Sequence, residues 1–197
     1  MNNLTIIYYI NNFNENLFES LNSLINQTDK NFELLIIADG IETIKEKSIE
    51  KLDLNEKLSN FKFIVINNFN SHSASFELAR KYVQTKYVYF ADRSNIFDQN
   101  FVKCFNKFIL NNKNEEYDLL FLTIGKDVAN YPDLKKLKLC EFKKNIYLQI
   151  LGKMVNKIIN ADFIKQNNIS FIPFKHYTTH FSYELVSFAK KLQYCLM

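Results

Sequence analysis

Two acidic side chains follow apolar, strand-like segments of this sequence. Asp39 comes directly after the segment 32–38, and Asp92 comes directly after the segment 87–91. In a parallel sheet the carboxyl ends of neighbouring strands meet at one edge, and ligands bind at that edge. The carboxylates could accept hydrogen bonds from a ligand there, while the structural alternative is that each caps a helix or turn. We expect a ligand site, because both aspartates fall at the same predicted edge.

Strand and helix patterns alternate along the chain and would position these carboxylates. Apolar runs rich in β-branched and aromatic residues predict strands over residues 4–10, 32–38, 61–66, 87–91 and 119–124. Apolar residues at helical spacing predict helices around residues 17–25, 41–52, 73–84 and 101–108. This alternation predicts an α/β fold with a mostly parallel sheet flanked by helices. Beyond about residue 130 the pattern becomes less regular and predicts a more helical C-terminal part.

The composition excludes several other classes of protein. A length of 197 residues with 47% hydrophobic residues suits a single globular domain, residues 1–197. The formal charge is only +4 and the lysines are dispersed among acidic residues, so we expect no nucleic-acid partner. No apolar stretch is long enough for a transmembrane helix, and the first residues do not resemble a signal peptide.

The motifs of several common sites are absent from the sequence. Cys104, Cys140 and Cys195 are far apart, which favours reduced thiols in a core over a disulfide framework or a zinc site. The three histidines do not form an HExxH motif. With only 3 glycines, neither the GxGxxG motif nor the P-loop that binds phosphate groups is present.

Short motifs occur in an order and spacing that are similar to a known family. Asn-Gln-Thr at 26–28 precedes Lys-Asn-Phe-Glu at 30–33 and Asp-Gly at 39–40. Tyr-Val-Tyr-Phe-Ala-Asp at 87–92 precedes Asp-Gln-Asn-Phe at 98–101. Near the end are Asn-Lys at 156–157 and Asn-Asn-Ile-Ser-Phe at 167–171. Together these motifs resemble family-2 glycosyltransferases of the GT-A fold, of the bacterial type that builds surface polysaccharides, over about residues 4–194.

The resemblance implies transfer of a sugar from a nucleotide-diphosphate donor to an acceptor hydroxyl, in the synthesis of a cell-surface glycan or glycolipid. It implies a GT-A-like (Rossmann-like) fold, with about residues 1–125 as the nucleotide-binding half and about 126–197 as the acceptor-side, mostly helical part. In the family a divalent metal, Mg²⁺ or Mn²⁺, neutralises the leaving diphosphate. The favoured donor is a uridine diphosphate sugar, and the implied nucleotide-binding residues are Asn12, Asp39, Asp92 and Arg93.

The phosphate side of the implied site departs from the family pattern. Asp92 is retained, but Ser94 replaces the second aspartate of the DxD motif, and a hydroxyl binds a hard divalent cation less well than a carboxylate does. Phe76 stands where the family often has an arginine. The candidates for holding a metal are therefore Asp92 with Ser94 or Asp98. Arg93 could replace the metal as a phosphate clamp, or it could form a local ion pair or remain solvated.

The acceptor side departs as well, because the Glu-Asp motif that carries the family's general base falls on Tyr-Thr at 177–178. Thr178 cannot act as a base near neutral pH, whereas the flanking His176 and His180 are of a type that transfers protons there. A structural role is the alternative for both histidines. The catalytic candidates are thus His176, Thr178 and His180.

Two interpretations of function stay open at this stage. The first is a glycosyltransferase that uses a nucleotide sugar, and the second is a catalytically inactive GT-A-like domain that acts as a binding or partner module, because the expected carboxylates are missing. An unrelated doubly wound nucleotide-binding protein would require the order of the motifs to be coincidental. We expect a cytoplasmic protein, with peripheral association at the inner membrane surface as an alternative location, and an acceptor that the sequence does not identify.

Overall fold

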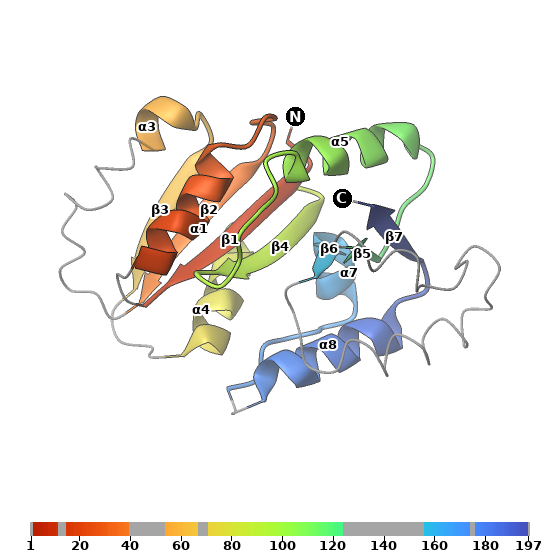
Figure 1. The fold of residues 1–197 in the computed structure, drawn as a ribbon. Coiled ribbons are helices and arrows are strands. Elements are labelled where there is room, and N and C mark those ends of the chain that lie inside the picture. Colours follow the sequence, from red (N-terminus) through yellow and green to blue (C-terminus); the bar gives the residue numbers. More distant parts are fainter. Residues whose placement is uncertain are drawn as a thin grey trace.

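The computed structural model describes residues 2–11, 15–39, 54–66, 71–123, 156–173 and 176–196 (Figure 1). Its strands are β1 (Leu4–Ile10), β2 (Glu33–Asp39), β3 (Phe61–Ile66), β4 (Tyr87–Asp92), β5 (Leu119–Thr123), β6 (Lys157–Asn160) and β7 (Leu192–Leu196). Its helices are α1 (Glu15–Ile25), α3 (Leu54–Lys57), α4 (His72–Ala79), the 3-10 helix η1 (Arg80–Tyr82), α5 (Phe101–Asn111), α7 (Ala161–Gln166) and α8 (Tyr177–Phe188). The helix predicted over 41–52 lies outside the described residues.

The strands form one mixed sheet in the order β3-β2-β1-β4-β6-β5-β7. The neighbouring strands β3, β2, β1 and β4 are parallel, and β7 is parallel to β5. Only β6 runs antiparallel to its neighbours β4 and β5 among the pairings described. The predicted α/β architecture with a mostly parallel sheet is therefore confirmed, and the parallel half brings the carboxyl ends of β1, β2 and β4 together.

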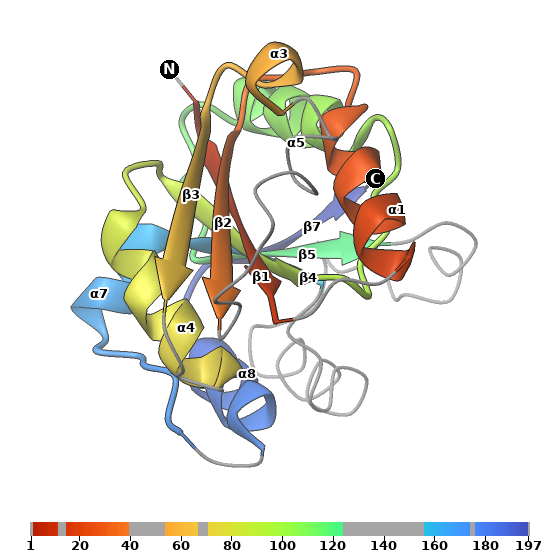
Figure 2. The ribbon, with the colours of Figure 1, turned by 90° about the vertical axis from the view of Figure 1, so that its left-hand side faces the viewer.

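Alternate side chains of the strands enter two separate cores. In β1, Leu4, Ile6 and Tyr8 face one core while Ile7 and Tyr9 face the other, as the two-residue period of a strand requires. Buried residues of α1 and α5 complete the first core, and those of α4, α7 and α8 complete the second. The two groups of helices cover opposite faces of the sheet (Figure 2). None of the helices in the described segments is long and apolar enough to cross a membrane.

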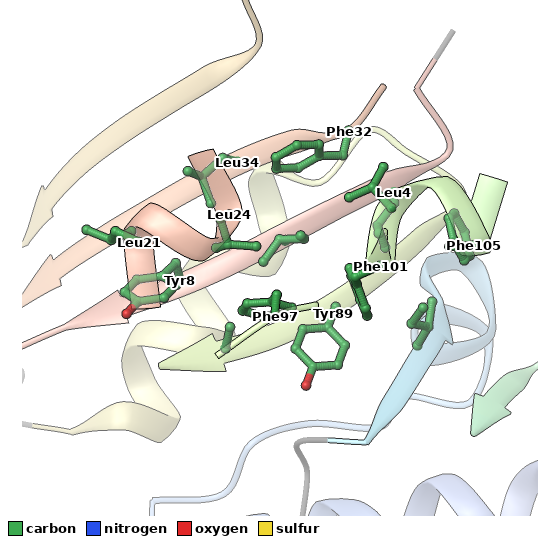
Figure 3. Close-up of a cluster of buried hydrophobic side chains, with 14 of the residues drawn as sticks. Leu4, Tyr8, Leu21, Leu24, Phe32, Leu34, Tyr89, Phe97, Phe101 and Phe105 are labelled. Carbon is green, nitrogen blue, oxygen red and sulfur yellow. The ribbon is translucent and has the colours of Figure 1, made fainter. Parts of the chain in front are cut away.

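The first core is closed by aromatic rings from β4, α5 and the loop between them. The ring centroid of Tyr89 lies 5.6 Å from those of both Phe97 and Phe101, which lie 5.0 Å from each other (Figure 3). All three side chains are at most 9% exposed. Edge-to-face contacts of this kind add to the stabilisation from burial. The segment after β4 is therefore held firmly against the sheet.

Gln27, from the Asn-Gln-Thr motif, explains why α1 ends next to that segment. Its buried amide donates to the carbonyl oxygens of Ser23 (2.9 Å) and Asp98 (2.7 Å), and its carbonyl oxygen accepts from the backbone N–H of Val102 (3.0 Å). The neighbouring backbone N–H of Thr28 donates to the carbonyl oxygen of residue 99 at 2.8 Å. This motif of the family resemblance therefore has a structural role, which is to join α1 to the start of α5.

The strands β6 and β7 are not among the predicted strands, and one predicted helix has a different end. The strand β6 is not predicted, because it has only four residues and contains a lysine, whereas its pairing with β4 and β5 depends on contacts distant in sequence. The helix predicted over 73–84 is an α-helix only up to Ala79 and continues as η1 before Val83 turns extended. Such 3-10 turns are frequent at the ends of α-helices.

The side chain of Asn160 caps the N-terminus of α7, and its contribution to stability can be tested. Its side-chain oxygen accepts from the backbone N–H groups of Asp162 (2.9 Å) and Phe163 (3.2 Å), which caps α7. We expect Asn160→Ala to lower the free energy of unfolding by about 1 kcal/mol. Asn160→Ser keeps an acceptor and should cost only about a few tenths of a kcal/mol. Urea denaturation of both variants measures the difference, and equal losses would contradict a capping role.

Candidate functional site

The carboxyl ends of β1, β2 and β4 meet at one edge of the sheet, which we call the carboxyl edge. Tyr9 of β1 lies opposite Asp92 of β4 in the register, and Asp39 is the last residue of the other neighbour, β2. The two aspartates of the sequence analysis therefore flank the end of β1, where ligands of parallel sheets bind. The candidate residue Asn12 follows β1 and lies outside the described residues.

Asp39 is buried, with 2% of its surface exposed, and its carboxylate is fully oriented by hydrogen bonds. One oxygen, Oδ2, accepts from the Tyr9 hydroxyl (3.2 Å), the Ser75 hydroxyl (3.1 Å) and the backbone N–H of Ser71 (3.2 Å). Ser71 is the N-cap residue of α4. Asp39 therefore holds the start of α4 against β1 in addition to any role toward a ligand.

Asp92 begins a tight turn whose groups bond to one another. Its Oδ1 accepts from the backbone N–H of Ser94 (2.8 Å) and from the Ser94 hydroxyl (2.5 Å). The side chain of Asn95 accepts from the backbone N–H of Asp92 (2.9 Å). The hydroxyl of Ser20 on α1 donates to the backbone carbonyl of Asn95, which ties the turn to the first core. The Asp92 carboxylate is thus fixed at the carboxyl edge together with Ser94.

His72, the first residue of α4, also lies at the carboxyl edge and is not among the site residues predicted from the sequence. Its ring centroid is 3.8 Å from that of Tyr9. Burial lowers the pKa of His72, while the carboxylates of Asp92 and Asp39 raise it and the guanidinium of Arg93 lowers it further. The side chains of Asp39, Asp92 and Arg93 are therefore all close enough to His72 to change its pKa. The sequence signal that could have found His72 is its position at the start of the helix that follows strand β3.

Tyr177, the first residue of α8, approaches the same edge from the C-terminal part of the chain. Its ring centroid is 6.3 Å from that of His72. Burial, with a contribution from the Asp92 carboxylate, raises the pKa of Tyr177 to about 12. Segments about a hundred residues apart in the sequence thus converge here, and Tyr177 is neutral at physiological pH.

The three catalytic candidates lie around the first turns of α8. His176 is exposed and is the N-cap residue, while Thr178 is half-buried. His180 is half-buried, and its Nδ1 lies 3.6 Å from Oε2 of Glu184, one turn further along α8. Of the three, His180 is the one beside an acidic partner in the described part of the chain.

Asp98 forms its hydrogen bond within a different turn from that of Asp92. Asp98 is exposed, and its Oδ1 accepts from the backbone N–H of Asn100 at 2.8 Å, within the turn that leads into α5. Arg93 is half-buried and lies within electrostatic range of His72 and Tyr8. The carboxyl edge therefore brings together Asp39, Asp92, Arg93 and Ser94, whereas Asp98 serves the approach to α5.

Comparison with known sequences identifies the family of this chain. The sequence model described as Glycosyl transferase family 2 matches residues 5–172. The chain belongs to glycosyl transferase family 2. The resemblance seen in the motifs is therefore confirmed over most of the sequence. A comparison with curated proteins finds no match.

Solved structures of glycosyltransferases show the same fold as this family-2 chain. Residues 1–349 of TarS from S. aureus match all of it with a TM-score of 0.76 at 20% identity, and the chain spans 58% of that fragment. The TarS complex with UDP-GlcNAc gives a TM-score of 0.75 at 19% identity, over 100% of this chain and 59% of the other. The mannosyltransferase PcManGT from Pyrobaculum calidifontis, in complex with GDP-Man and Mn²⁺, gives 0.64 at 9% identity, over 99% and 56% of the two chains. These likenesses establish the GT-A-like fold.

The metal site implied by the family resemblance does not fit the residues at the carboxyl edge. Asp92 is the one carboxylate of the DxD-like turn, and Ser94 directs its hydroxyl hydrogen toward Asp92. Within the described residues, no three His, Cys, Asp or Glu side chains gather as a ligand set. One carboxylate with one hydroxyl is a weak protein ligand set for Mg²⁺ or Mn²⁺, which proteins bind through one or two carboxylates together with substrate phosphates and water.

Phe76 also makes the site differ from the one that the family resemblance implies, because it removes a positive charge near the expected phosphate position. It stands in place of the helix arginine that family-2 enzymes often carry, and its side chain is only 2% exposed. Its ring centroid lies 5.1 Å from that of Phe90 and 5.5 Å from that of Phe171. A hydrophobic contact between α4 and the second core therefore replaces a cationic group at this position.

Proposed function

We propose that this chain transfers a sugar from a nucleotide-diphosphate donor, of the uridine diphosphate type, to an acceptor hydroxyl of a cell-surface glycan or glycolipid. The observation that carries the proposal is the position of Asp39 and Asp92 on either side of the end of β1, in a chain of glycosyl transferase family 2. TarS, which has the same fold, was solved in complexes with UDP-GlcNAc and with UDP.

The donor would bind along the carboxyl edge. Asp39, together with Asn12, would contact the nucleoside, because its carboxylate is held in one orientation and can accept a hydrogen bond from a base N–H. Asp92 and Arg93 would lie next to the diphosphate and the sugar. The fixed geometry of both aspartates means that little reorganisation would accompany binding, which favours affinity.

For the chemical step we propose His180 as the general base. Its Nδ1 faces Glu184, so a proton on Nδ1 would be stabilised and Nε2 would be left to accept the proton of the acceptor hydroxyl. The acceptor oxygen would then form a bond to the anomeric carbon as the bond from that carbon to the diphosphate oxygen breaks. The nucleoside diphosphate would leave with the electron pair of that bond.

A cytoplasmic location is part of the proposal. Cys104 and Cys195 are not joined in a disulfide in the described part of the chain, which suits a reducing compartment. The third cysteine, Cys140, lies outside the described residues. Contact with the inner membrane surface would allow a lipid-linked acceptor to reach the site, and sedimentation with vesicles that contain anionic lipid would test that contact.

The proposed function is tested by UDP binding and by donor turnover. We expect saturable heat when the full chain is titrated with UDP, and release of UDP from a UDP-sugar in the presence of acceptor or, more slowly, of water. Asp92→Asn and His180→Ala should each lower turnover by about tenfold or more. His176→Ala is the matched control on the exposed side of the same helix start and should retain activity. If no uridine or other nucleoside diphosphate binds at millimolar concentration, the proposal is wrong.

A further inference from the structure

The turn after β4 lacks the second negative charge that the family resemblance implies, because Ser94 stands at that position, and it carries a positive charge on the neighbouring Arg93. Between Asp92 and Ser94 stands Arg93, one of only two arginines among the 25 basic residues. The other, Arg80, has a structural role, since it is paired with Glu77 and donates to the carbonyl of Ile169 at 2.8 Å. Arg93 is therefore the one arginine at the carboxyl edge, on a chain that otherwise uses lysine.

The guanidinium of Arg93 lies near the end of β1. It lowers the pKa of Tyr8 against the larger effect of burial, and it lowers the pKa of His72. Tyr8 belongs to one core of the sheet, and the ring of His72 packs on Tyr9, which belongs to the other. Arg93 directly follows Asp92, which lies opposite Tyr9 in the register of β1 and β4. Arg93 therefore belongs to the carboxyl edge, beside the aspartate next to which the donor would place its diphosphate.

His72 adds a hydrogen-bond donor next to this charge. Its ring is held by the rings of Tyr9 (3.8 Å) and Tyr177 (6.3 Å), so its direction is restricted. It is the first residue of α4, a helix of 8 residues whose N-terminus carries a partial positive charge. Burial lowers the pKa of His72, so the imidazole is neutral at pH 7 and offers one N–H group.

We propose that the guanidinium of Arg93 and the ring N–H of His72 bind the donor diphosphate directly, so that donor binding does not require a divalent metal. This inference rests on the proposed function and specifies how its donor site works. A guanidinium presents two parallel N–H groups that can donate to two phosphate oxygens, in addition to its positive charge. A lysine ammonium has the charge but lacks this fixed pair of donors. The same group would stabilise the negative charge that develops on the leaving diphosphate.

The first test is calorimetric titration of the full chain with UDP in two buffers, one with excess EDTA and one with Mn²⁺. We expect dissociation constants that agree within about twofold. If UDP binds with Mn²⁺ and binding is lost in EDTA, the inference is overturned and the proposed function stands. If neither UDP nor any other nucleoside diphosphate binds in either buffer, the proposed function itself is overturned.

The second test compares Arg93→Ala, Arg93→Lys and His72→Ala in EDTA. We expect Arg93→Ala to weaken UDP binding by about tenfold or more and Arg93→Lys to weaken it less, because the lysine keeps the charge and loses the paired N–H groups. His72→Ala should weaken UDP binding by about threefold to tenfold. Lys81→Ala removes one exposed positive charge in η1 and should leave the affinity unchanged.

Comparing UDP with uridine distinguishes a phosphate contact of Arg93 from a merely structural role, such as an ion pair with Asp92. A phosphate contact predicts that Arg93→Ala weakens binding of UDP but leaves binding of uridine, measured by NMR titration, unchanged. A structural role predicts equal losses for both ligands, and that result, or an unchanged UDP affinity, would overturn the inference. Circular dichroism and thermal unfolding of each variant establish that the fold is retained.

Discussion

Replacing Asp39 by alanine is expected to lower the free energy of unfolding by about 3 kcal/mol. The substitution leaves three donors without their acceptor at a buried position: the hydroxyls of Tyr9 and Ser75 and the backbone N–H of Ser71. Leaving a buried donor unsatisfied costs about 1–3 kcal/mol. Partial relaxation of α4 would let some of the three donors find other partners, so the total loss is smaller than three times this cost. The same change should also abolish measurable UDP binding, because both the nucleoside contact and the position of His72 on α4 would be lost.

The matched control for this prediction is Asp39→Asn. Asparagine has the same shape and keeps one oxygen acceptor for the three donors, so we expect the variant to retain most of the stability. Urea denaturation followed by circular dichroism measures both variants, and calorimetry measures their UDP affinity. Equal stability of Asp39→Ala and the wild type would contradict the role of this carboxylate in holding α4. Unchanged UDP affinity in the folded Asp39→Ala variant would contradict its role toward the nucleoside.

The positions of Asp39 and Asp92 could be predicted from the sequence because each depends on a local pattern. A buried parallel strand is a short run of apolar, β-branched and aromatic residues, and the residue that ends it is visible in the sequence. Parallel strands also bring their ends to one edge without any further information. Hence β1, β2 and β4 and the candidate ligand edge follow from the sequence, as does the family.

The contact between His72 and Tyr177 could not be predicted, because it depends on tertiary structure. The start of the helix after β3 points to His72 as a residue near the edge, but nothing in the local sequence shows that the ring of Tyr177 approaches it. Their proximity results from the packing of α4 and α8 on the same face of the sheet, which involves residues about a hundred positions apart. The strand β6 was missed for the same reason, since four residues carry too little pattern to identify a strand.

Lys157 shows that a motif residue can be recognised in the sequence while its physical state is not. It belongs to the Asn-Lys motif of the family resemblance and lies in β6, with none of its surface exposed. Its Nζ donates to the side chain of Asn156 at 3.1 Å. Burial lowers the pKa of Lys157 to about 7. A free lysine has a pKa of about 10.5. Between about pH 7 and pH 10.5, therefore, Lys157 is mostly protonated in the unfolded chain and mostly neutral in the folded chain.

We therefore expect the free energy of unfolding to rise with pH above about 7, with a slope of up to about 1.4 kcal/mol per pH unit, which is that of one proton. The rise should be measured by urea denaturation between about pH 7 and pH 8.5, because above about pH 9 the buried Cys195, whose pKa is raised to about 12, acts in the opposite direction. Below about pH 6.5 the lowered pKa of His72 adds a second loss of stability as the pH falls.

Lys157→Met removes the ionisable group and keeps a long apolar side chain in the same core. We expect the variant to lose most of the pH dependence between about pH 7 and pH 8.5 and to be more stable than the wild type at pH 7 by about 2–4 kcal/mol. Lys165→Met, on the adjacent helix α7, is the matched control, since its ammonium is exposed and its ion pair with Asp162 is 3.7 Å long. The control should change neither the slope nor the stability appreciably. A variant Lys157→Met that is less stable at pH 7 would mean that the buried ammonium is charged and that its interactions outweigh the cost of burial, and Lys157 would then be a structural cation of the fold.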